Sequence, residues 1–289
     1  MFVSSMQAQS KLNQFLTPSD TLHKPRRNAL VISEASIAAI TLVGLDQLWY
    51  ADFERTSFQF NNDNNEWLQL DKYGHVFSSY QLGRIGAEAL DWAGVSKKDQ
   101  LIYGATLGFG FLTAVEVLDG FSAQWGFSWG DVIANASGTA LYVGQELLWD
   151  EQRIALKYSF SRTEFAAQNP SLLGNGLSEE FLKDYNGQTY WLSFNINSFL
   201  KTKFLPDWLN LATGFGADGL LTGSPDNVDF PNQNPFRQYY LSFDIDLTRI
   251  KTNSNILKSI FSVFNTIKVP MPTLEYNGEN GFRLHYIYF

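Results

Sequence analysis

The spacing of hydrophobic and polar positions changes near residue 150. Before this point, apolar residues recur every three to four positions, which is the period of a helix with one buried face. Four segments have this spacing: 29–50, 72–93, 101–118 and 129–148. After this point, apolar and polar residues alternate, which is the period of a β-strand. The pattern predicts a helical domain over 29–150 and an antiparallel β region over 151–289.

The β region contains two stretches with the same alternation, Tyr190–Asn197 and Tyr239–Asp246. Successive side chains of a strand point to opposite faces, so each stretch has an apolar face and a polar one. The apolar members are Leu192, Phe194, Leu241 and Phe243, and the polar members opposite them are Ser193, Asn195, Asp244 and Asp246. Residues 153–165 alternate in the same way and predict a strand with one solvated face.

Three further segments complete the predicted β region. Residues 209–221 contain three glycines and predict a curved strand. Residues 281–289 end in phenylalanine, as the closing strand of a bacterial outer-membrane barrel does. Residues 255–268 are amphipathic and predict a helix, which Pro270 and Pro272 end.

A hairpin is also expected over 53–70, with its turn in the asparagine-rich stretch 61–65. The five strands predicted after residue 150 are fewer than the roughly eight that close a barrel. We therefore expect an α+β fold: a helical bundle packed with an antiparallel, barrel-like outer-membrane-type β-sheet. The longest uncharged helical runs, 101–115 and 132–145, are shorter than the ~18–20 residues of a membrane-spanning helix, so inner-membrane helices are not expected.

Charge and cysteine content exclude several classes of function. The net charge of -8 leaves no basic surface for nucleic acid, so DNA and RNA partners are excluded. The absence of cysteine excludes disulfides, thiolate metal sites, a cysteine nucleophile and lipidation through cysteine. Residues 1–9 resemble the remnant of a secretory signal peptide, and 10–28 form a polar lead-in segment. We therefore expect an exported protein.

Polar residues interrupt the most apolar helical segments, where ionisable groups are costly unless they are paired or used. They are Asp71, His75, Glu116, Asp119, Asp131 and Asn135. Asp71 and His75 lie four residues apart, as do Asp131 and Asn135, so each pair lies on one helical face. One hypothesis is a catalytic or metal site in which His75 is a base or ligand, the carboxylates of Glu116, Asp119 and Asp131 bind a divalent metal or protons, and Asn135 orients a substrate.

The alternative hypothesis is structural. Asp71 then caps the helix over 72–93, Ser128 and Asp131 form a capping box, Asp119 makes a turn with Gly120, and His75 satisfies a buried polar group. No complete catalytic motif occurs, and a cofactor other than a divalent metal is not expected.

The same residues carry a resemblance. Four motifs, Asp71-Lys-x-x-His75, Glu116-x-x-Asp119-Gly, Phe127-Ser-x-x-Asp131 and Ala134-Asn135-x-x-Gly138, resemble those of the YfiM-like family of predicted periplasmic lipoproteins. This uncharacterised family has a distant likeness to VanZ-type membrane proteins. The likeness spans Leu42–Gly144, and the long form with a C-terminal β region is similar to versions in the Bacteroidota. The absence of cysteine departs from the lipoprotein members and argues against a lipid anchor.

The resemblance implies a location in the cell envelope and no established activity. We expect a non-catalytic accessory or structural subunit of an outer-membrane protein assembly, for secretion or envelope biogenesis, because aromatic surface is abundant and no catalytic signature is complete. Its expected partners are other outer-membrane or periplasmic proteins and membrane lipid. The alternatives are a hydrolase or metal-dependent enzyme acting on lipid or cell-wall headgroups, and a barrel that binds lipid or another small ligand.

Overall fold

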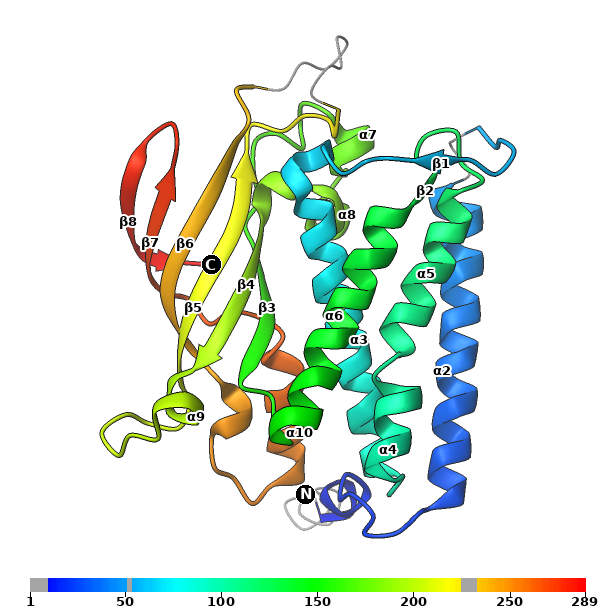
Figure 1. Cartoon of the computed structure of the whole chain (residues 1–289), viewed down its shortest axis with the longest axis vertical. Coiled ribbons are helices and arrows are strands. Elements are labelled where there is room, and N and C mark those ends of the chain that lie inside the picture. The colour runs from blue at the N-terminus through cyan, green and yellow to red at the C-terminus, as the bar shows by residue number, and fades with distance from the viewer. Residues whose placement is uncertain (1–9, 51–53, 225–232) are drawn as a thin grey trace, which may run out of the picture. The chain divides into compact units, whose positions relative to one another are not determined.

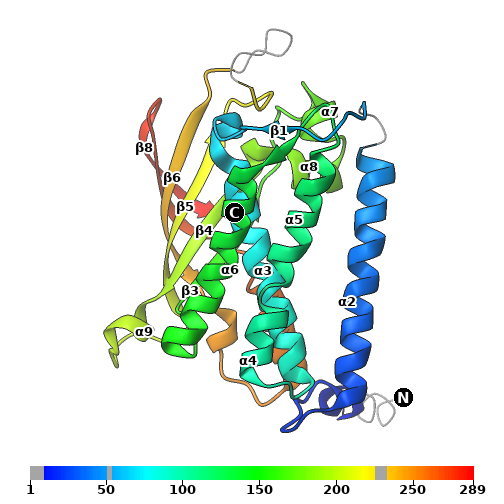
Figure 2. The ribbon, with the colours of Figure 1, turned by 45° about the vertical axis from the view of Figure 1, so that its right-hand side comes forward.

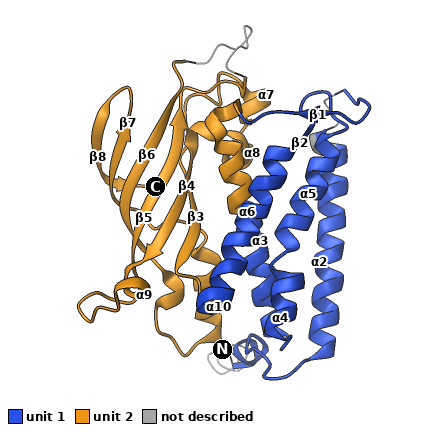
Figure 3. Cartoon of the chain, viewed as in Figure 1, with its two compact units in different colours: residues 1–64, 78–150 blue, residues 65–77, 151–289 orange. Residues whose placement is uncertain are grey.

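A computed structural model of the chain describes residues 10–50, 54–224 and 233–289. The predicted signal-peptide remnant, 1–9, lies outside the described residues. The chain folds into two compact units (Figure 3), one of residues 1–64 and 78–150 and the other of residues 65–77 and 151–289.

The first unit is helical, as the spacing of its apolar residues predicts. Its helices are α2 (Lys24–Gly44), α3 (Leu70–Trp92), α4 (Lys97–Asp99), α5 (Leu107–Asp119) and α6 (Trp129–Trp149). Helix α3 begins in the second unit and continues into the first from Ser78 onward. The hydroxyl of Ser128 accepts a hydrogen bond from the Asp131 backbone N–H (3.2 Å) and so caps the start of α6. Only this half of the predicted capping box is observed, because the Ser128 backbone N–H donates to Glu116 and not to Asp131.

Glycines let the helices of this unit approach closely. A Cβ atom added at Gly108 of α5 would lie 2.3 Å from the Ser79 carbonyl oxygen of α3, whereas one added at Gly110 would meet nothing within 4 Å. The backbones of α3 and α5 are therefore in direct contact at Gly108.

Gly108→Ala should accordingly lower the free energy of unfolding by about 1–3 kcal/mol, because the added methyl group forces the two helices apart. Gly110→Ala is the matched control in the same helix. It should raise the free energy of unfolding by roughly 0.5–1 kcal/mol through helix propensity alone. Chemical denaturation of both variants measures the difference. Equal effects would show that α3 and α5 do not touch at Gly108.

The hairpin predicted over 53–70 is wrong. Phe53 lies outside the described residues, and the only strand in the described remainder is β1 (Phe60–Asn61). It pairs in parallel with β2 (Phe127–Ser128), far away in the sequence. Aromatic contacts of Phe60 and Phe58 with Phe127 hold this pairing, and local alternation could not have revealed a partner so distant along the chain.

The second unit is built on one antiparallel sheet. Its six strands are β3 (Ile154–Phe160), β4 (Gln188–Asn195), β5 (Leu209–Asp218), β6 (Phe236–Ile245), β7 (Met271–Asn277) and β8 (Gly281–Tyr288). Each pairs with the next in chain order, as the views in Figures 1 and 2 show. The sheet is not closed into a barrel. The unit also contains short helices: α7 (Pro170–Leu173), α8 (Leu177–Lys183), α9 (Ile196–Leu200) and the amphipathic α10 (Asn255–Phe264).

The two faces of the sheet differ as the alternation predicts. Cross-strand pairing joins Leu192 to Thr213 and Thr213 to Leu241, and it joins Phe194 through Leu211 to Phe243. The four predicted apolar residues therefore share one face. Leu241 and Phe243 remain 45% and 49% exposed on it.

The expectation of a solvated face on the strand over 153–165 is wrong. Lys157 and Ser159 of β3 are buried, as are Ser193, Asn195 and Asp244. The sheet curls around this polar face. The Lys157 ammonium of β3 lies 2.8 Å from the Asp244 carboxylate of β6, although three strand spacings span about 14 Å in a flat sheet. The result is a polar interior and an apolar exterior, as in outer-membrane strands.

Strand β7 is absent from the sequence-based prediction. Pro270 and Pro272 indicated only the end of a helix, yet β7 contains Pro272 at an irregularity in its pairing with β8, a position where a strand tolerates proline. His285 pairs with Thr273 in the regular part of this register and lies on the interior face, where its Nε2 lies 2.6 Å from a carboxylate oxygen of Glu275.

The start of α3 packs on the apolar face of the sheet within the second unit. Tyr73 stacks on Phe215 with ring centroids 4.3 Å apart, and Leu70 forms a buried cluster with Ala217 and Leu220. This part of the apolar face is therefore covered by the chain itself.

Two helical segments, Lys24–Gln47 and Lys97–Asp119, are long and apolar enough to cross a membrane, judged by length and composition. The sequence-based expectation counted only uncharged runs, whereas a spanning segment tolerates one or two charged residues.

Candidate functional site

The candidate residues lie on three helices. Asp71 and His75 are in the first turns of α3, Glu116 and Asp119 are in the last turn of α5, and Asp131 is in the first turn of α6. Asn135 follows Asp131 by one turn and is fully buried.

Ser128 connects the ends of α5 and α6. Its backbone N–H donates to the Glu116 carboxylate (3.3 Å), and its hydroxyl donates to Asp63 (2.6 Å) while accepting from the Asp131 backbone. Ser128 therefore contacts two carboxylates, those of Glu116 and Asp63, and the backbone of Asp131.

Asp119 makes a different contact. Its carboxylate accepts a hydrogen bond of 2.6 Å from the Tyr50 hydroxyl, and α5 ends at Gly120 immediately after it. The contact ties the chain after α2 to the end of α5, so the observed role of Asp119 is structural.

Glu116 lies in a setting that disfavours its charge. Its side chain is almost fully buried, and this burial, followed by the negative charges of Asp131 and Asp119, raises its pKa from 4.5 to about 9. The Ser128 N–H favours the ionised form but offsets only part of the shift.

The raised pKa predicts a pH-dependent stability. Between about pH 4.5 and about pH 9, folded Glu116 keeps a proton that the unfolded chain releases, so the free energy of unfolding should fall as pH rises. This contribution is fully present below the unfolded pKa and lost once the folded pKa is passed. Glu116→Gln cannot ionise and should show a shallower fall. Urea unfolding at about pH 5 and about pH 9, with a chelator present, measures how steeply the free energy of unfolding falls with pH in each of the two proteins. An equally steep fall in the unsubstituted protein and in Glu116→Gln would show that the pKa of Glu116 is not raised.

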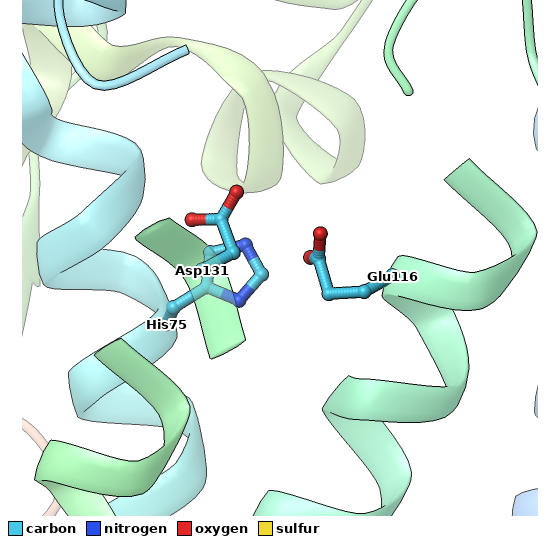
Figure 4. A group of neighbouring side chains, drawn as sticks. All are labelled: His75, Glu116 and Asp131. Atoms are coloured by element: carbon cyan, nitrogen blue, oxygen red, sulfur yellow. The ribbon is translucent and has the colours of Figure 1, made fainter. Parts of the chain in front are cut away.

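His75 completes the cluster. Helix α3 is continuous through Ser79, whose backbone contacts α5 at Gly108, so His75 lies one turn from that contact. One ring nitrogen of His75 and one carboxylate oxygen each of Glu116 and Asp131 lie within 4.8 Å of one another (Figure 4). The predicted convergence of these three side chains is therefore observed.

Asp71 belongs to a second group. One of its oxygens lies within 4.8 Å of oxygens of Asp63 and Asp131, and its carboxylate forms an ion pair of 2.9 Å with Lys72. The predicted capping role of Asp71 is not observed, because α3 begins at Leu70.

Sequence reasoning missed two members of the site, Asp63 and Tyr50. Asp63 lies in the stretch interpreted as a hairpin turn, and the hydroxyl of Tyr50 reaches Asp119, which is distant along the chain. No motif in the neighbouring sequence predicts either contact, because both depend on the tertiary fold.

The arrangement can hold positive charge. An imidazole nitrogen and two carboxylate oxygens that converge in a buried setting can share a proton or ligate a metal ion. The same groups are those that act as general bases in hydrolysis.

Comparison with known proteins gives one match. Residues 59–145 match the model of a family described as "Predicted periplasmic lipoprotein (DUF2279)", and all six candidate residues lie within them. This agrees with the resemblance found in the sequence. Searches of curated proteins and of solved structures give no significant match.

Proposed function

We propose, from the match of residues 59–145 to the predicted periplasmic lipoprotein family, that the protein is a non-catalytic accessory subunit of an outer-membrane protein assembly. The family supports an exported protein of the cell envelope. The apolar segment Lys24–Gln47 near the N-terminus is compatible with an export signal. The outer membrane and the assembly are inferred from the sheet.

The apolar outer face of the sheet carries the proposal. Large side chains on its last three strands are exposed to an unusual degree. They are Tyr239, Leu241, Phe243, Leu274, Tyr276, Phe282 and Leu284, between 38% and 73% exposed. A contiguous apolar surface of this kind marks a protein or membrane contact. We call these seven residues the outer face.

The open edge of the sheet favours a protein over lipid alone. In the described part of the chain no strand pairs with the far side of β8, so that edge presents backbone N–H and C=O groups. An open edge is not tolerated in hydrocarbon, where these groups find no partner, but it is a ready surface for another protein. A β-rich envelope protein satisfies both the edge and the outer face.

Site-specific photo-crosslinking tests the proposal. A photoreactive phenylalanine analogue in place of Phe282, which is 73% exposed on β8, should form an adduct with a second outer-membrane protein in intact cells. The same analogue at Leu182, which is 63% exposed on α8, is the matched control and should form no such adduct. Adducts with lipid only, or with a second copy of the chain only, would overturn the proposal.

A further inference from the structure

The cluster of Glu116, Asp131 and His75 presents a problem of charge. Glu116 and Asp131 are 2% and 4% exposed, and Asp119 and Asp63 add further negative charge at Glu116. Buried like charges are costly unless a proton or a cation compensates them. A proton or a cation at the cluster would therefore lower the cost of burying these carboxylates.

A single proton on Glu116 does not account for the whole arrangement. It neutralises one carboxylate, whereas a histidine nitrogen and an Asp131 oxygen also converge on the same point from two other helices. A metal ion uses all three donors at once. Metal sites are commonly built from side chains on facing helices of a bundle.

The donor types select the class of metal. An imidazole nitrogen with two carboxylate oxygens suits Zn²⁺, Mn²⁺ and Fe²⁺, whereas Ca²⁺ and Mg²⁺ prefer oxygen alone. Ligand atoms around Zn²⁺ lie about 2.0–2.2 Å from the ion, and hence roughly 3.3–3.6 Å from one another in a tetrahedral site. The three donors lie within 4.8 Å of one another, so a bound ion would draw them closer together.

A hydrogen bond holds one of the carboxylate ligands in place. Ser128 donates its N–H to the Glu116 carboxylate, and a hydrogen bond of this kind orients a metal ligand. Ser128 also caps the helix that carries Asp131. The second acidic group is a weaker candidate, because Asp63 already accepts the Ser128 hydroxyl and Asp71 is paired with Lys72.

We infer that His75, Glu116 and Asp131 form a binding site for one divalent transition-metal ion, which links helices α3, α5 and α6. The inference is independent of the proposed assembly, because it concerns contacts among helices and not the outer face of the sheet.

The test uses the full chain, purified in mild detergent and stripped with a chelator. Addition of ZnCl₂ or MnCl₂ alone should restore one equivalent of bound metal, measured by elemental analysis. At a hundred-fold excess over Kd the melting temperature should rise by roughly 5–10 °C. Of the three single variants, His75→Ala, Glu116→Gln and Asp131→Asn, each should weaken binding at least about ten-fold.

Glu146→Gln is the matched control. Glu146 is a carboxylate on α6 that pairs with Lys97, and its loss should leave metal binding unchanged. Melting temperatures of the metal-free variants establish that each is folded. Absence of Zn²⁺ and Mn²⁺ binding to the folded protein, equal binding by the three variants and the unsubstituted protein, or a response to Ca²⁺ or Mg²⁺ alone would each overturn the inference.

Discussion

Leu241→Arg is expected to release the protein from its assembly while leaving the chain folded. Leu241 lies in the middle of the outer face and is 45% exposed in the isolated chain, so the substitution should change the free energy of unfolding of the purified protein by no more than about 0.5 kcal/mol. In the proposed assembly the same position is covered by an apolar partner surface. A buried guanidinium there should weaken the contact by about 2 kcal/mol or more, roughly thirty-fold.

Two measurements separate these effects. Co-elution from detergent-solubilised envelopes reports the assembly, and denaturation of the purified chain reports folding. Leu182→Arg is the control, because Leu182 is exposed on α8, whose Phe181 packs against β3, at the opposite end of the strand order from β8. Retained co-elution of the Leu241→Arg protein would show that the outer face is not the contact surface.

Asp244→Ala should cost more stability than any exposed substitution. The Asp244 carboxylate lies fully buried, 2.8 Å from the Lys157 ammonium, and accepts hydrogen bonds from Ser193 (2.7 Å) and the Val269 backbone (3.1 Å). Its removal leaves Lys157 charged and buried without its carboxylate. Loss of one member of a buried pair costs about 3–5 kcal/mol.

Lys251→Ala provides the comparison. Lys251 pairs with Asp207 at the surface, and its side chain is 90% exposed, so its loss should cost no more than about 1 kcal/mol. Combining Asp244→Ala with Lys157→Met should recover part of the stability, because no uncompensated cation then remains at position 157. Urea denaturation compares the three proteins. A cost for Asp244→Ala as small as that for Lys251→Ala would show that the polar face is solvated.

The division of each strand into two faces was predictable from the sequence, but the face that is buried was not. Alternation fixes which residues share a face, as for Leu192 and Leu241. It does not fix the direction in which the sheet curls. That direction depends on contacts between distant strands, such as Lys157 with Asp244. The polar residues of the strand over 153–165 are therefore buried, although alternation alone predicted that they meet water.

The candidate site was predictable where helical spacing determines it. Ser128 caps the helix that carries Asp131, which is half of the predicted capping box, and His75, Glu116 and Asp131 converge as one hypothesis required. The contact of Tyr50 with Asp119 and that of Asp63 with Ser128 depend on how loops return to the helices. The hydrophobic period of a single segment cannot predict which distant helix a loop will contact.

The most direct test of the proposed assembly uses the absence of cysteine from the chain. A single Leu241→Cys substitution creates one thiol on the outer face, and Leu182→Cys creates one at an exposed control position. Maleimide labelling is then timed in intact outer membranes and in the purified, dissociated protein. We expect the thiol at position 241 to be protected in membranes and labelled after dissociation, while the thiol at position 182 reacts in both. Equally fast labelling at position 241 in intact membranes would contradict the proposed assembly.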